Sequence, residues 1–218
     1  MISPNPDLLA KQLQEAKEIK DQVWYGYLLK KGLFGYTLKE DEFSVIIDGS
    51  VKAAEELSQQ ISTTMTVCTP FEVADKLGLT LDFLSEELRD PFLYFGMFYP
   101  PEKKIILNQS VLDFLKKMIL QNKLEKIISP ELLVDVILYH EIFHALEEIT
   151  PGIFTRSRMR KQKWLGIFSY GSGFSGASEV GAVHFSKLMS GLHYSPCIYE
   201  NLLLLGLHKL SEDQILPQ

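Results

Sequence analysis

The most informative residues of the chain are two histidines and a glutamate within five consecutive positions. Residues 140–144 read His-Glu-Ile-Phe-His, which is an HExxH pattern. Positions i and i+4 lie on the same face of a helix, so His140 and His144 can both point at one metal ion. Glu141 is rotated by about 100° from His140, which places its carboxylate beside the ion, where it can act as a general base. The pattern therefore predicts a catalytic Zn²⁺ site with Glu141 as its base.

A catalytic zinc ion usually takes three protein ligands and keeps one position open. Glu147 and Glu148 are near in sequence, but ligands spread over about 10–12 Å of one straight helix cannot converge on a single ion. The third ligand must therefore come from a later segment of the chain.

Glu179 is the favoured third ligand. It lies near the start of a predicted helix, in Ser-Glu-Val-Gly-Ala at residues 178–182. Because Gly181 and Ala182 are small, this helix can approach the HExxH helix closely enough for a carboxylate to reach the ion. The alternative ligands are Glu200, which lies in a more peripheral segment; His184, about 140° around the helix from Glu179; and His193, in a loop.

A hydrolytic centre also needs a donor for the developing oxyanion besides the metal. Three residues are candidates for a transition-state or substrate contact, and each is equally plausible as ordinary loop packing: Tyr170, His193 and Tyr194.

The elements around the HExxH segment follow from capping residues and hydrophobic periodicity. Ser129-Pro130-Glu131 is a typical helix start, and Thr150-Pro151-Gly152 ends that helix. The preceding chain predicts a helix over 70–77, a strand over 79–83, a hairpin of strands 92–99 and 104–108, and a helix over 109–127. The remaining segments predict helices over 7–30, 42–60, 177–190 and 197–210, with a loop-rich stretch over 150–176.

These segments resemble the ImmA/IrrE-type metallopeptidase domain, a member of the HExxH-plus-Glu zincins, or gluzincins. The resemblance covers residues 70–190 and rests on three stretches in order: Val-Ala-Asp-Lys-Leu-Gly-Leu at 73–79, Lys-Lys-Ile-Ile-Leu-Asn at 103–108, and the HExxH at 140–144. A fourth is Glu179 with Ala182, Phe185 and Met189. The resemblance implies a zincin-like fold and a zinc-dependent peptidase with a selective protein substrate, such as a regulatory protein.

We therefore expect an α+β chain: a small twisted sheet of about three strands packed on the HExxH helix, with additional N- and C-terminal helices. Residues 1–69 would form a helical region packed on the core, and residues 70–218 would form the zincin-like domain, with the two making one compact unit overall.

The composition of the chain limits the classes of binding partner and the cellular location that we expect. The 218 residues carry a formal net charge of −6, which disfavours a generic nucleic-acid binder. Only two cysteines are present, outside any CxxC, which excludes a disulfide framework. We expect a cytoplasmic protein without a signal peptide or a membrane span, and with a protein or peptide as its substrate.

Several alternatives stay open. Residues 72–85 have the spacing of a helix-turn-helix, but their acidic recognition segment would be repelled by phosphates. The basic run at residues 156–163 is either solvated surface or a lid over an acidic substrate. The strand at 92–99 is either plain core or an edge that pairs with an extended peptide. The whole chain could also be a zincin-fold binding module with weak catalysis.

Overall fold

A computed structural model describes residues 6–32, 38–65, 69–89, 93–157, 159–164, 168–173, 175–211 and 214–217. Of residues 6, 40, 159–164, 168–173 and 175, it describes the backbone alone. The helices of the described chain are α1 (Pro6–Glu18), α2 (Asp21–Lys31), α3 (Glu40–Thr64), α4 (Pro70–Lys76), α5 (Gln109–Gln121), α6 (Leu133–Ile149), α7 (Phe154–Ser157), α8 (Ser175–Ser190) and α9 (Cys197–Gly206). The strands are β1 (Thr80–Leu84), β2 (Gly96–Tyr99), β3 (Lys104–Asn108), β4 (Met159–Trp164) and β5 (Phe168–Gly173).

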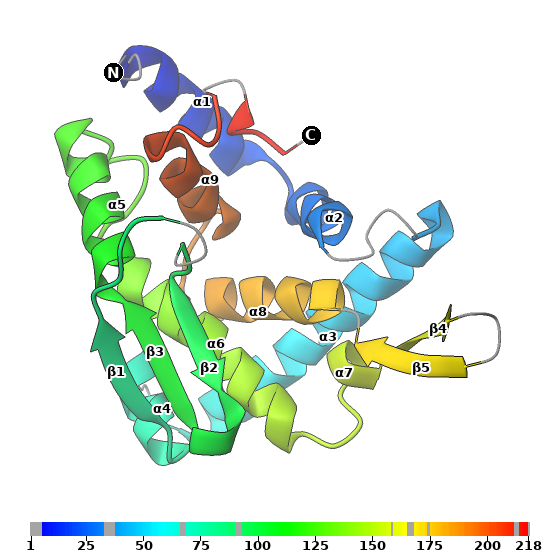
Figure 1. Cartoon of the computed structure of the whole chain (residues 1–218). Coiled ribbons are helices and arrows are strands. Elements are labelled where there is room, and N and C mark those ends of the chain that lie inside the picture. Colours follow the sequence, from blue (N-terminus) through cyan, green and yellow to red (C-terminus); the bar gives the residue numbers. More distant parts are fainter. Residues whose placement is uncertain are drawn as a thin grey trace.

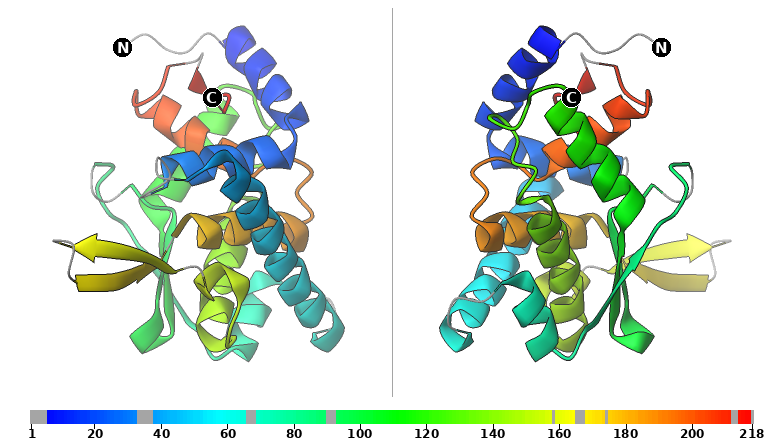
Figure 2. Two further views of the ribbon diagram at one scale, coloured as in Figure 1. Left: turned by 90° about the vertical axis from the view of Figure 1, so that its right-hand side faces the viewer. Right: turned by 90° about the vertical axis from the view of Figure 1, so that its left-hand side faces the viewer.

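A three-stranded mixed sheet forms one wall of the molecule (Figure 1). The strand order is β1-β3-β2, with β1 parallel and β2 antiparallel to β3. On the central strand, Ile105 and Leu107 are fully buried, and they face the helices, which lie on one side of the sheet (Figure 2). The predicted α+β class with a small three-stranded sheet is confirmed, and β2 is left as an edge strand beside α6.

Helix α6 is the centre of the core because it is apolar nearly all round, as a helix surrounded by other elements must be. It packs against α8, α4, α5, β2 and β3. The predicted close approach of α8 is confirmed at Gly181. A Cβ added there would lie 2.5 Å from the ring of Phe143 in α6, which no real side chain tolerates. Only glycine allows this helix crossing.

Of the N-terminal helices, α2 and α3 pack mainly on α8, and α1 packs on α9. Helix α3 packs along α8, and α2 crosses it (Figure 1). The Lys187 ammonium donates to both carboxylate oxygens of Asp21 at 2.8 and 2.7 Å, and the Tyr25 hydroxyl lies 2.7 Å from Nδ1 of His184. Residues from α1, α2 and α3 belong to the same buried cluster as those of α6 and α8.

Three element predictions differ from the structure in kind, and the helix predicted over 109–127 also ends early, at Gln121. The single helix predicted over 7–30 is two helices, because Lys20 is extended and α2 turns to reach α8. The helix start predicted at Ser129 is wrong, since α6 begins at Leu133. The backbone of Ser129 is bonded instead to the hydroxyls of Tyr194 and Tyr199, at 2.9 and 2.6 Å.

The third difference is the stretch predicted as loop over 150–176. It contains α7 and an antiparallel hairpin of β4 and β5, paired from Met159↔Gly173 to Trp164↔Phe168. Strand β4 carries three residues of the basic run, Arg160, Lys161 and Lys163, and β5 is rich in glycine and serine, so neither shows a clear alternating apolar pattern of the kind that signals a strand. Within the described chain, the helices lack the combined length and hydrophobicity that crossing a bilayer requires.

Candidate metal centre

Three side chains from two helices converge at one point. The Nε2 atoms of His140 and His144 lie 3.1 Å apart, and the carboxylate of Glu179 lies 3.4 Å from His140 Nε2 and 3.8 Å from His144 Nε2. Tetrahedral ligands at about 2.0–2.1 Å from a zinc ion would be about 3.3–3.4 Å apart. The two Glu179 distances involve different carboxylate oxygens, Oε2 toward His140 and Oε1 toward His144. With one ligand atom taken from each residue, the three atoms lie within 4.8 Å of one another, so the three side chains form a donor set that could hold a single zinc ion.

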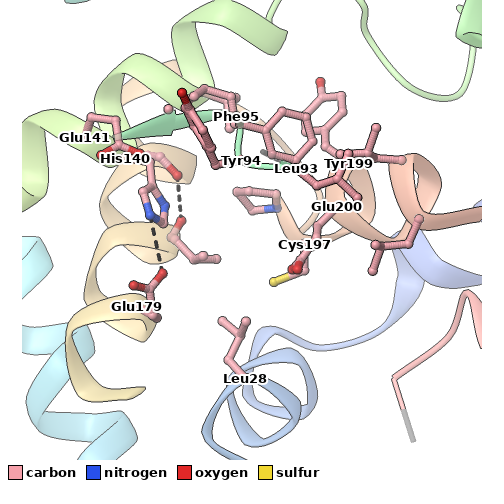
Figure 3. Close-up of a pocket in the computed structure, with 18 residues that line it drawn as sticks. Leu28, Leu93, Tyr94, Phe95, His140, Glu141, Glu179, Cys197, Tyr199 and Glu200 are labelled. Carbon is pink, nitrogen blue, oxygen red and sulfur yellow. Dashed lines mark hydrogen bonds and ion pairs between the residues drawn. The ribbon is translucent and has the colours of Figure 1, made fainter. Parts of the chain in front are cut away.

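The helices explain this convergence. His140 and His144 are one turn apart on α6, at the edge of the helix that the core leaves partly open, with side chains 21% and 20% exposed. Glu179 is in the first turns of α8, which crosses α6 at the Gly181 contact. Figure 3 shows the His140 ring and the Glu179 carboxylate pointing toward each other across this crossing.

Glu141 lies beside the cluster rather than in it. The residue is only 6% exposed, and its carboxylate accepts a hydrogen bond from the backbone N–H of Phe98 on β2. Burial raises the pKa of Glu141, while the neighbouring imidazoles of His140 and His144 oppose that rise. A Cβ at Gly96 would lie 2.9 Å from Cγ of Glu141. Strand β2 can therefore lie this close to Glu141 only because position 96 is a glycine.

Glu147 holds His144 from the side away from the cluster. Its Oε2 lies 3.2 Å from Nδ1 of His144, and its side chain is 1% exposed. The Ser178 hydroxyl donates to the same oxygen at 2.5 Å and lies 3.1 Å from Nδ1. This network assigns the proton of His144 to Nδ1, which leaves the Nε2 lone pair free for a metal.

The surrounding carboxylates favour positive charge at the His144 imidazole. Burial alone would lower the pKa of His144, but Glu147, Glu179 and Glu141 together raise it to about 9. Burial likewise opposes ionisation of Glu179, yet the imidazoles of His140 and His144 lower its pKa to about 2. A cluster of two imidazoles surrounded by three carboxylates is therefore suited to binding a divalent metal cation.

The cluster opens into a cleft. Residues of the β2 edge line this cleft together with Arg156 and the ligand-bearing residues of α6 and α8. Arg156 forms an ion pair with Glu148. Glu148 thus pairs outside the ligand cluster, and Glu147 contacts the outer nitrogen of His144 instead of joining the cluster as a ligand.

The other predicted contacts lie elsewhere. The Tyr194 hydroxyl is bonded to Ser129 N–H and to Tyr199, and His193 is exposed; neither lines the cleft or the cavity beside it. Tyr170 lies in β5, and its side chain is outside the described residues. The rival ligand His184 points to Tyr25 and Glu55.

The basic run is described only in part. Arg156 is in α7 and lines the cleft. Arg158 and the side chains of Arg160, Lys161 and Lys163 lie outside the described residues. The remaining rival ligand, Glu200, is paired with Lys31 at 2.7 Å, on the far side of the cavity that adjoins the cluster.

Sequence reasoning rejected Glu147 as a metal ligand without foreseeing its contact with His144, and it missed Ser178 and Gly96 as parts of the site. An acid three residues after a ligand histidine, and a hydroxyl residue just before the third ligand, are the signals that could have indicated the first two. Gly96 carries no such signal.

No protein-family model matches the chain, and neither do the curated proteins or the solved structures with which it was compared.

Proposed function

We propose that the chain is a zinc-dependent metallopeptidase of the zincin type, similar to the ImmA/IrrE-type gluzincins, with a selective protein as its substrate. The observation that carries the proposal is the convergence of His140, His144 and Glu179 within ligand distance, with the HExxH glutamate buried directly beside them. Two imidazole nitrogens and one carboxylate are a common donor set for catalytic zinc.

Each residue has a separate role in this proposal. His140, His144 and Glu179 would hold the ion, and Glu147 would orient His144. When bound, zinc supplies Lewis acidity that activates water and polarises a carbonyl group. Glu141 would accept a proton from the attacking water and pass it to the leaving amine, which completes the hydrolysis of one peptide bond.

The edge of β2 would orient the substrate. The Phe98 N–H that donates to Glu141 lies on the side of β2 away from β3, so this edge faces the ligand cluster. An extended peptide could add to the edge as a further antiparallel strand and bring a backbone carbonyl to the ion. A substrate held in this way would be a protein segment rather than a small molecule.

The test separates hydrolysis from metal binding. Wild-type protein and Glu141→Gln are loaded with zinc and incubated with a library of peptides, and products are identified by mass spectrometry. We expect equal zinc contents, cleavage at defined bonds by wild type, and no cleavage by the variant. Equal cleavage by both proteins would contradict the proposal. Zinc binding without cleavage by either would favour the alternative of a catalytically weak zincin-fold binding module.

A further inference from the structure

A second cavity branches from the ligand cluster toward the other end of the molecule. It has a volume of about 240 Å³ and is bounded by α2, α6, α8, α9 and the segment before β2 (Figure 3). Gly96, His140, Glu141 and Glu179 line both this cavity and the open cleft. The cavity is therefore a side pocket of the cleft, and its mouth lies at the proposed zinc centre.

Three polar side chains in the pocket wall away from the ligand cluster, those of Ser186, Tyr199 and Glu200, already have partners within the protein. The Ser186 hydroxyl donates to the Val183 carbonyl at 3.0 Å, and the Tyr199 hydroxyl donates to the Ser129 carbonyl at 2.6 Å. The Glu200 carboxylate lies 2.7 Å from the Lys31 ammonium. A ligand therefore gains little from these three groups.

The rest of the wall is apolar. It is formed by Leu28 of α2, Val183 of α8, Leu203 and Leu204 of α9, and neighbouring aliphatic and aromatic side chains. The Cys197 thiol adds to this character, because burial raises its pKa to about 12 and keeps it neutral. Burial of a large aliphatic or aromatic side chain in such a wall contributes about 1.5–3 kcal/mol, or roughly 10- to 100-fold in affinity.

The size of the pocket points to one side chain rather than to a whole ligand. Cavities for drug-sized molecules measure about 300–1,000 Å³, and this one has about 240 Å³. Its mouth, at Glu141 and Gly96, is beside the β2 edge along which an extended peptide would run. A side chain next to the reacting bond can enter it without the backbone leaving the cleft.

We infer that this pocket binds a large apolar side chain, such as leucine, methionine or phenylalanine, on the residue adjoining the bond that is cut. Helices α2 and α9, outside or at the margin of the region that resembles a metallopeptidase, would then select the substrate. The inference rests on the proposed function, because it assumes that the cluster at the pocket mouth holds the reacting carbonyl.

The test measures binding rather than turnover. Three peptide hydroxamates, which chelate zinc, differ only in the side chain beside the hydroxamate: isobutyl, aminobutyl or hydrogen. Zinc stoichiometry is measured first, and the affinity of each hydroxamate for the zinc-loaded protein is then measured by calorimetry. The isobutyl compound should bind about 10- to 100-fold more tightly than the compound with hydrogen, and the aminobutyl compound should gain no such advantage.

Two variants fill the pocket from different helices. If one of them fails to fold, the other still tests the inference. Leu28→Trp and Leu204→Trp change partly exposed wall residues. Both should abolish the preference for isobutyl while leaving zinc stoichiometry and the affinity of the hydrogen compound unchanged. Val23→Trp is the matched control, since Val23 is on α2, 51% exposed and outside the pocket wall. It should keep the preference.

The outcomes distinguish the two levels of the inference. Zinc binding with equal affinity for all three hydroxamates, or a preference for aminobutyl, would overturn the apolar pocket and leave the metal centre standing. Absence of zinc binding would overturn both. An isobutyl preference that survives both tryptophan variants would also contradict this pocket as its source.

Discussion

The carboxylate of Glu147 lies 3.2 Å from Nδ1 of His144, and the Nε2 of the same ring faces His140 and Glu179. One imidazole is thus held on one side by a buried acid and presented on the other to the ligand cluster. Partners of this kind fix the tautomer and the orientation of a ligand histidine, and their loss typically weakens metal binding by about 10- to 100-fold.

Replacing Glu147 by alanine should therefore reduce zinc affinity by about 10- to 100-fold, because the His144 ring loses the group that fixes its proton at Nδ1. Competition with a fluorescent chelator measures the change, and circular dichroism checks the fold. Glu148→Ala is the matched control, because Glu148 is the next residue on α6 and pairs with Arg156 at the surface. If both variants bind zinc as tightly as wild type, Glu147 does not position the ligand.

Gly181 should be the most sensitive glycine of the α6–α8 crossing. A methyl group there would meet the buried ring of Phe143 and the methyl of Thr155, and overpacking of this kind costs about 1–3 kcal/mol. We expect Gly181→Ala to lower the free energy of unfolding by that amount, as measured in urea. The same variant should bind zinc more weakly, because α8 carries Glu179.

Gly26 provides the comparison for Gly181. It is inside α2, where an added Cβ meets nothing within 4 Å. Gly26→Ala should raise the free energy of unfolding by about 0.5–1 kcal/mol, since alanine loses less conformational freedom in a helix. Equal effects of the two substitutions would show that the contact with Phe143 does not limit the approach of α8.

His184 should make stability depend on pH. Burial lowers its pKa, and Glu55, Asp21 and Lys187 are the charged groups around it, while Tyr25 is hydrogen-bonded to its Nδ1. An unfolded chain, with the ordinary histidine pKa of about 6.5, then binds a proton more readily than the folded chain. The resulting stability is complete above that pH and is lost as the pH falls through it toward the folded pKa.

The comparison with His184→Gln isolates this contribution, because all other histidines are unchanged and glutamine keeps an acceptor for Tyr25. Between pH 7.5 and pH 5, the wild type should lose stability faster than the variant, by at most about 1.4 kcal/mol per pH unit. The free energies come from urea unfolding of the metal-free proteins. Parallel pH profiles would contradict a neutral buried His184.

The clustering of His140, His144 and Glu179 was more predictable from the sequence than the residues that hold them in place. The HExxH spacing placed two imidazoles on one helical face, and the small residues after Glu179 indicated a helix that approaches closely. These inferences need only local geometry. The roles of Ser178 and Gly96 depend on how separate elements meet, and no local pattern encodes them.

The same distinction explains the errors in the elements. Ser129-Pro130 has the residues of a helix start, but Tyr194 and Tyr199 from a distant segment take its backbone groups. Tyr194, one of the two tyrosines considered as a donor to the oxyanion, thus accepts a hydrogen bond from Ser129 instead. The sequence of α2 predicted a helix in the N-terminal region and no role in the site. In the folded chain, however, this helix forms one wall of the side pocket.

The most direct test of the central claim is a crystal structure of the zinc-loaded protein, with anomalous scattering measured at the zinc edge. We expect one peak per chain, about 2.0–2.2 Å from Nε2 of His140, Nε2 of His144 and a carboxylate oxygen of Glu179. A peak bound elsewhere, or one on the two histidines with Glu179 turned away from it, would contradict the proposed centre.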